Sequence, residues 1–131
     1  MIGLDTNVLV RYITQDHPEQ SERADDLLES KCTKESPGLL ALLVLCELVW
    51  VLRGAYGYKK SAIIKVIEQI LVCRELMVEN YRVAFSALAA YKKGSADFAD
   101  YVIAFTNKDA GCEATFSFDR KLAKLPFVKR P

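Results

Sequence analysis

The sequence predicts an α/β fold in which short strands alternate with helices. Two brief apolar segments, residues 2–4 and 114–118, are expected to be strands, and an aspartate follows each of them, Asp5 and Asp119. Between them, apolar residues recur with the spacing of amphipathic helices. This alternation is typical of a mostly parallel sheet covered by helices on both faces. We therefore expect one domain over residues 1–131, with a central sheet of four to five short strands.

The first half of the chain supplies the clearest helix signals. Asp5, Thr6 and Asn7 are all residue types that cap helix N-termini, so a helix is expected directly after the first strand. Pro18 suits the first position of a second helix, which is expected to run to about residue 32. A turn at 34–38 leads to a short strand and then to a long apolar helix that ends near Tyr56.

The second half is expected to continue the alternation. Ser61 is the candidate N-cap of a helix over 62–73, and residues 76–78 form a brief strand. A helix over 81–91 and a basic loop over 92–95 precede a helix that begins at Asp97 and ends at Gly111, which is a favourable C-terminal cap. A strand over 114–118, a helical turn and residues 126–128 close the chain.

Glu47 is the ionisable residue within the apolar run 39–52. The run is shorter than the roughly 20 residues that a membrane span needs, so it predicts a buried helix. Burial of a carboxylate costs roughly several kcal/mol of hydration free energy. Such a group must therefore be protonated, paired with a cation or bound to a metal. A neutral or paired structural glutamate stays open as the alternative. Trp50 and Tyr56 are expected to pack in the core or in a dimer interface.

The composition excludes several kinds of active site. Lys and Arg number 18 and Asp and Glu 17, so the net charge does not indicate a partner. The one histidine, His17, precedes a proline in a polar stretch, which argues against Ser or Cys triads and typical zinc sites. The four cysteines are scattered, which is typical of reduced thiols in a cytoplasmic protein, and no signal peptide is apparent.

Carboxylates are therefore the candidates for catalysis. Asp5 and Asp119 follow strands, where open α/β sheets place their ligands, and Asp97 and Asp100 stand at a helix start. Each acid alone could be a helix cap. Together with Glu47 they would repel one another without a cation, and oxygen ligands without His or Cys suit Mg²⁺ or Mn²⁺. The chemistry indicated is metal-assisted hydrolysis of a phosphodiester bond.

Four stretches of the chain resemble the PIN-domain family, and more narrowly the VapC-type toxins of type II toxin–antitoxin pairs. They are residues 3–12 around Asp5, 45–52 around Glu47, 96–100 with Asp97 and Asp100, and 115–121 around Asp119. Their order and spacing extend over essentially the whole chain. The resemblance implies a three-layer PIN-like fold and a magnesium-dependent endoribonuclease.

The resemblance also implies roles for individual residues. Asp5, Glu47, Asp100 and Asp119 fall on the acidic quartet of the family, and Asp97 on a frequent extra acid. Asp5, Asp100 and Asp119 would ligate the metal directly or through water, and Glu47 and Asp97 would orient metal-bound water or hold a second ion. The supporting positions are Thr6 and Asn7, after the first acid, and Ser117, where relatives often carry Thr.

The implied partners are RNA, a VapB-type antitoxin that occludes the site, and a second copy in a homodimer; a membrane is not among them. Six cations flank the acidic motifs and could contact RNA phosphates, although most are expected to be merely solvated. These are Arg11, Lys92, Lys93, Lys108, Arg120 and Lys121.

Two other functions would also use an acidic metal pocket. A receiver domain also has an acidic magnesium pocket, but it needs a phospho-accepting aspartate at a central strand end. No aspartate lies between Asp26 and Asp97, which excludes this class. A catalytically inactive PIN-like binding module that retains the acidic metal pocket stays open as the alternative. The sequence does not identify the RNA, and one or two metals fit equally.

Overall fold

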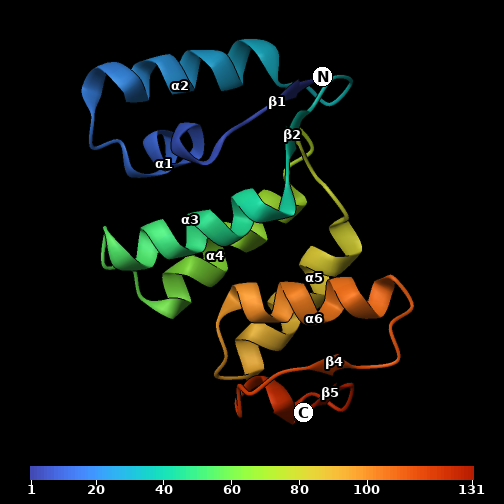
Figure 1. Cartoon of the computed structure of the whole chain (residues 1–131). Coiled ribbons are helices and arrows are strands. Elements are labelled where there is room, and N and C mark those ends of the chain that lie inside the picture. Colours follow the sequence, from blue (N-terminus) through green and yellow to red (C-terminus); the bar gives the residue numbers. More distant parts are fainter. The chain divides into compact units, whose positions relative to one another are not determined.

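The computed structural model describes all residues, 1–131, and they form two compact units, Met1–Glu79 and Asn80–Pro131 (Figure 1). The prediction of one domain over 1–131 stays a prediction.

The first unit contains a parallel sheet with the strand order β1-β2-β3. Ile2 pairs with Gly38, and Gly38 pairs with Leu76, so the first residues of the three strands lie side by side in the sheet. Helices connect the strands, as parallel pairing requires. The elements are β1 (Ile2–Gly3), α1 (Thr6–Thr14), α2 (Pro18–Lys31), β2 (Gly38–Leu40), α3 (Leu42–Gly54), α4 (Lys60–Val72) and β3 (Leu76–Val78).

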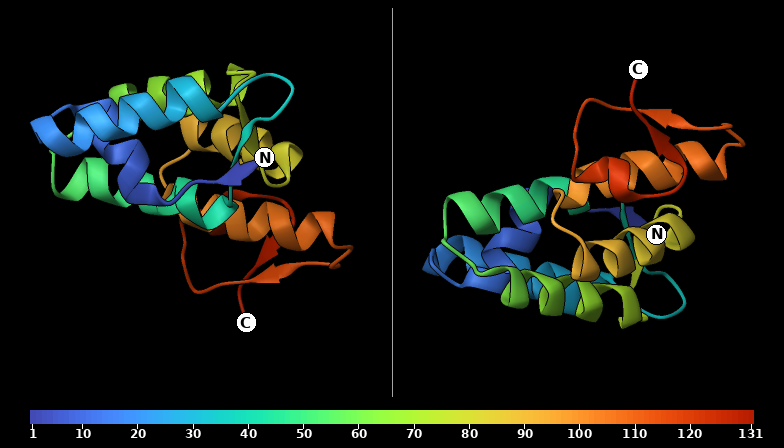
Figure 2. Two further views of the ribbon diagram at one scale, coloured as in Figure 1. Left: turned by 90° about the horizontal axis from the view of Figure 1, so that it is seen from above. Right: turned by 90° about the horizontal axis from the view of Figure 1, so that it is seen from below.

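Local chemistry explains where α1 and α2 begin. Asp5 is the N-cap of α1 and His17 that of α2, where the ring Nδ1 accepts a hydrogen bond from the backbone N–H of Gln20 (3.1 Å). Pro18 occupies the start of α2, as predicted. The two helices lie side by side in Figures 1 and 2. The core of the unit is aliphatic, and its fully buried side chains include Leu40, Leu45, Leu48, Leu52, Ile63 and Ile67.

The second unit packs α5 against α6 and adds a pair of parallel strands (Figure 2). Its elements are α5 (Tyr81–Lys93), α6 (Phe98–Asp109), β4 (Thr115–Phe116), a 3₁₀ turn η1 (Leu122–Lys124) and β5 (Val128–Lys129). Ala84, Ala87 and Ala104 are completely buried, so small side chains let the helices approach closely. The rings of Tyr91 and Phe98 meet edge to face with centroids 5.7 Å apart.

Close packing fixes the turn between α5 and α6. A Cβ atom at Gly94 would collide with the hydroxyl of Tyr101, so this position requires glycine. The same hydroxyl accepts a hydrogen bond from the backbone N–H of Ala96 (3.3 Å). Tyr101 lies in the first turn of α6, so these contacts hold the start of that helix in place.

The predicted α/β fold class with parallel strands is confirmed. The five short strands are hydrogen-bonded as a sheet of three and a pair. The predicted end of α6 is confirmed as well, because Gly111 has a positive φ of 92° and follows the cap residue Ala110. The N–H of Gly111 donates to Lys108 and that of Cys112 to Asn107, which is a Schellman motif.

Two local predictions are wrong. Ser61 is not an N-cap, because α4 begins at Lys60 and Lys59 caps it without a side-chain hydrogen bond. Lys92 and Lys93 do not form a loop, because α5 continues to Lys93. The spacing of apolar residues indicates which face of a helix is buried but does not fix its first or last residue. Both errors therefore concern helix boundaries.

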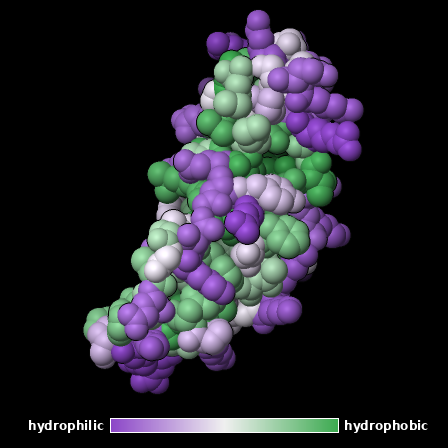
Figure 3. Space-filling view, turned by 90° about the vertical axis from the view of Figure 1, so that its right-hand side faces the viewer, coloured by the Kyte–Doolittle hydropathy of each residue, from purple (hydrophilic) through white to green (hydrophobic).

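Trp50 is 52% exposed, so of its two predicted locations, the core and a dimer interface, the core does not apply, and Tyr56 is half-buried. Leu43 on the same helix is also exposed, so α3 is not buried on all sides. Figure 3 shows hydrophobic residues among hydrophilic ones on the face that it displays. None of the helices combines the length and the apolar character that crossing a membrane requires.

Candidate metal centre

The first unit brings Asp5 and Glu47 to a shared contact, the side chain and backbone of Thr6. Asp5 follows β1, and its Oδ1 accepts a hydrogen bond from the N–H of Thr6 (2.8 Å). Asp5 is therefore a helix cap, as the alternative interpretation held. A carboxylate has two oxygens, so capping by one is compatible with metal binding by the other.

Glu47 lies on α3 and is half-buried. Its Oε1 accepts a hydrogen bond from the hydroxyl of Thr6 (2.7 Å), across a sequence separation of 41 residues. Thr6 is itself only 8% exposed, so this bond is shielded from water. No ion pair neutralises Glu47, which excludes the interpretation of this residue as half of a structural salt bridge. Asn7, the other predicted supporting residue here, is exposed on the first turn of α1.

The second unit gathers Asp97, Asp100 and Asp119. Asp97 is the N-cap of α6, but its side chain makes no capping hydrogen bond. Its backbone oxygen instead accepts hydrogen bonds from the N–H groups of Asp100 (3.1 Å) and Tyr101 (3.3 Å). The interpretation of Asp97 and Asp100 as a capping pair therefore does not account for the Asp97 carboxylate.

Burial raises the pKa of Asp100, and the neighbouring carboxylates of Asp119 and Asp97 raise it further. The side chains of Asp100 and Asp119 also share a hydrogen bond that favours the neutral form of Asp100. The three carboxylates, from the N-cap of α6, its first turn and the loop after β4, are thus close enough to repel one another. A cation would relieve their repulsion.

Asp119 is held in a defined orientation. Its backbone N–H donates to Oγ of Ser117 (3.0 Å), and its Oδ1 accepts from the N–H groups of Lys121 (2.8 Å) and Leu122 (3.2 Å). Ser117 therefore positions the backbone of Asp119, which agrees with the supporting role expected of its hydroxyl. The side chain of Asp119 also begins the turn that leads to η1.

Every candidate ligand is a carboxylate oxygen, which is the type of donor that Mg²⁺ and Mn²⁺ prefer. No group of three or more His, Cys, Asp or Glu side chains has an arrangement that could hold a metal ion. Asp5 and Glu47 belong to the first unit, and Asp97, Asp100 and Asp119 to the second. The complete quartet therefore stays a prediction.

Arg11 is engaged in a polar network that the sequence did not reveal. Its Nε donates to Gln20 (2.7 Å), and one of its terminal nitrogens contacts Asp16 (3.2 Å) and the hydroxyl of Tyr56 (3.1 Å). The hydroxyl of Tyr56 donates a hydrogen bond to Asp16 (2.6 Å), and this bond is the largest cause of the lowered pKa of that carboxyl. Arg11 is therefore a structural residue that ties α1 to the end of α3. Lys108, another of the predicted cations, lies 4.5 Å from the ring centre of Phe127.

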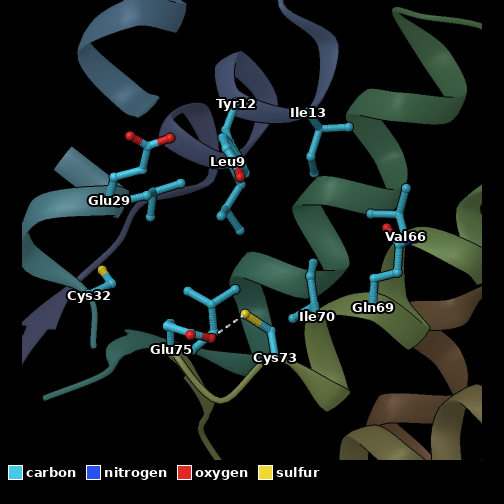
Figure 4. A pocket seen from close by; sticks show the side chains of 12 residues that line it. Leu9, Tyr12, Ile13, Glu29, Cys32, Val66, Gln69, Ile70, Cys73 and Glu75 are labelled. Carbon is cyan, nitrogen blue, oxygen red and sulfur yellow. Dashed lines mark hydrogen bonds between the residues drawn. The ribbon is translucent and has the colours of Figure 1, made fainter. Parts of the chain in front are cut away.

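A cavity of about 620 Å³ in the first unit holds none of the predicted site residues (Figure 4). Leu9, Ile13 and Ile70 line it, and Glu29 and Glu75 are at its polar part. The thiol of Cys73 donates a hydrogen bond to Glu75 (3.4 Å), and burial raises the pKa of this thiol. The cavity is thus distinct in its residues from the acidic clusters.

Comparison with known proteins gives two matches. A model of the PIN domain matches residues 2–128 of the chain. A protein described as VapC ribonuclease, from Aquifex aeolicus (strain VF5), is 28% identical over 124 residues. This similarity extends over 95% of the chain and 91% of that protein. No solved structure matches the chain.

Proposed function

Because the chain belongs to the PIN domain family, we propose that it is a metal-dependent endoribonuclease of the VapC type. The observation that carries the proposal is the pair of acidic groupings, one joined by Thr6 and one in which Asp119 and Asp97 raise the pKa of Asp100. The similarity to a protein described as VapC ribonuclease supports RNA as the substrate.

In this proposal Asp5, Asp100, Asp119 and Glu47 hold Mg²⁺ or Mn²⁺, and Asp97 supports them. Bound there, the ion would supply an activated water and offset the charge of the scissile phosphate. The hydroxyl of Thr6 holds the Glu47 carboxylate in orientation, and Ser117 does the same for the backbone of Asp119. Because the pKa of Asp100 is raised, a cation that favours its charged form would compete with protons for this cluster.

The proposal includes the biological setting of such nucleases. A VapB-type antitoxin would occlude the acidic site, the toxin would act in the cytoplasm, and it would form a homodimer. The exposed side chains of Leu43 and Trp50 on α3 are suitable apolar contacts for a second copy.

The experiment that tests the nuclease compares Asp5→Asn and Asp100→Asn with the wild type, one substitution from each unit. RNA cleavage with Mn²⁺ and inhibition of cell growth on expression should both be lost, while circular dichroism stays unchanged. Asp26→Asn is the matched control, because Asp26 is an exposed carboxylate on α2. Full toxicity in a well-expressed Asp100→Asn variant would refute the proposal.

An inactive PIN-like binding module is the second candidate. The acidic clusters support metal binding, which the module and the nuclease share, so they favour both equally. Titration with Mn²⁺ and an RNA cleavage assay separate the two. Metal binding that depends on Asp100, without any turnover of RNA, would favour the binding module.

A further inference from the structure

The second unit contains a polar pocket at the opposite end of α6 from Asp97 and Asp100. A short turn joins α5 to α6 and the two helices pack against each other, so the start of α5 lies beside the end of α6 (Figure 1). The side chain of Asn80 spans these ends, because its Oδ1 accepts from the N–H of Val83 (3.4 Å) and its Nδ2 donates to Asp109 (3.2 Å). The pocket has a volume of about 340 Å³, and the residues that line it are Arg82, Val83, Ser86, Phe105, Lys108 and Asp109.

Helical spacing directs the lining side chains to this place. Arg82 and Ser86 are four residues apart on α5, and Phe105 and Asp109 are four residues apart on α6, so each pair lies on one face of its helix. At 1.5 Å per residue, Lys108 lies roughly 12 Å along α6 from the acidic cluster at the start of that helix. The pocket is therefore separate from the acidic residues.

Two cations line the pocket, and neither has a carboxylate partner. Arg82 and Lys108 are both exposed, and neither takes part in a salt bridge. Nζ of Lys108 lies 4.5 Å from the centre of the Phe127 ring, which meets the ring of Phe105 edge to face at 5.1 Å. The aromatic contact restrains the amino group without neutralising its charge. The planar guanidinium of arginine matches the oxygens of a phosphate group, so the pair is suited to a phosphorylated ligand.

The other lining residues indicate a ligand larger than a bare phosphate. A volume of about 340 Å³ falls within the range of small-molecule sites, which begins at roughly 300 Å³. Phe105 is half-buried and offers an aromatic surface on which a base can stack. Asp109 would repel a phosphate, but a carboxylate in a nucleotide site accepts hydrogen bonds from ribose hydroxyls. A ribonucleotide carries all three of these groups.

We propose that this pocket binds a ribonucleoside monophosphate. Its phosphate contacts Arg82 and Lys108, and a ribose hydroxyl donates to Asp109. The base stacks on Phe105. Two cations match the charge of one terminal phosphate, whereas following a nucleic-acid strand requires a row of cations. Binding here is independent of the proposed nuclease activity, since it needs neither a divalent ion nor cleavage.

The test measures the binding of adenosine 5′-monophosphate by titration calorimetry, with EDTA present so that no divalent ion links the nucleotide to the acidic residues. Arg82→Gln and Lys108→Met should each raise Kd about tenfold, the loss expected for one charge-assisted hydrogen bond. The methionine keeps a long side chain beside Phe127. Arg23→Gln is the matched control, because Arg23 is an exposed arginine on α2, and it should bind as the wild type does.

A second comparison tests the role of Asp109. The wild type should bind 2′,3′-dideoxyadenosine 5′-monophosphate about fivefold more weakly than the ribonucleotide, because the hydrogen bond to the carboxylate is lost. Asp109→Ala should bind the two nucleotides equally. A wild type that binds both equally would overturn the assignment of a ribonucleotide.

The remaining outcomes are equally decisive. Wild-type Kd values for both cation variants, or the absence of saturable binding by the wild type, would overturn the inference. Inorganic phosphate that binds as tightly as the nucleotide would also overturn it, because the pocket would then be a site for a simple anion. Binding of a 12-nucleotide RNA that depends on Arg82 and Lys108, without binding of the mononucleotide, would overturn it by assigning these cations to an RNA strand. The nuclease is tested separately by cleavage in Mn²⁺, so either proposal can fail while the other holds.

Discussion

Replacing Thr6 by valine removes one hydroxyl from the first acidic grouping and keeps the volume of a residue that is 8% exposed. The lost hydrogen bond, 2.7 Å to Oε1 of Glu47, ends on a carboxylate. Hydrogen bonds to charged groups contribute roughly 1.5–3 kcal/mol, and the low end applies because Glu47 is half-buried. We therefore expect the free energy of unfolding to fall by about 1.5 kcal/mol, or about 6 °C in Tm.

The effect on function should be larger than this stability loss implies. Substitution of a residue that orients a metal ligand typically lowers metal affinity or activity by about 10- to 100-fold. Titration calorimetry with Mn²⁺ and initial rates of RNA cleavage, both at a temperature where Thr6→Val is folded, measure the two quantities. Thr6→Ser keeps the hydroxyl and should retain most activity. Wild-type metal affinity and cleavage in Thr6→Val would refute the role assigned to this hydroxyl.

Three further predictions concern single residues. Asp100→Asn should abolish cleavage yet stabilise the metal-free protein by roughly 0.5 kcal/mol in urea unfolding, since partial solvent screening limits the gain. The folded pKa of Asp100 lies above 3.8, so the metal-free wild type should become more stable as pH falls from neutral toward that pKa, and Asp100→Asn should lack this rise. Ser117→Ala should lower cleavage about tenfold while Ser117→Thr should not, because only alanine removes the acceptor of the Asp119 N–H. Tyr56→Phe should leave cleavage intact but reduce stability above pH 3.8. The Tyr56 hydroxyl lowers the pKa of Asp16 in the fold, so the stabilisation that it provides disappears as pH falls through that lowered pKa. Thermal melts across pH 2–6, roughly the range over which a carboxyl titrates, measure this change.

Much of the fold is predictable from the sequence because its signals are local. The alternation of strands and helices, the proline at the start of α2 and the glycine after α6 each act within a few residues. The boundary at Ser61 was mispredicted because a good capping residue does not by itself fix where a helix begins. The exposure of Trp50 is not predictable in this way, because an apolar sequence does not indicate which face of a helix lies toward solvent.

The site is predictable in its residue types but less so in its supporting contacts. The bond between Thr6 and Glu47 joins residues 41 apart, and that between Arg11 and Tyr56 joins residues 45 apart. Such contacts arise from tertiary packing and leave no periodic signal.

The central claim is that Asp5 and Asp100 each take part in binding a divalent ion. Titration calorimetry with Mn²⁺ on the wild type, Asp5→Asn and Asp100→Asn tests it most directly. We predict one binding event in the wild type and its loss in each single variant. Binding of Mn²⁺ in both variants as tightly as in the wild type would contradict the claim.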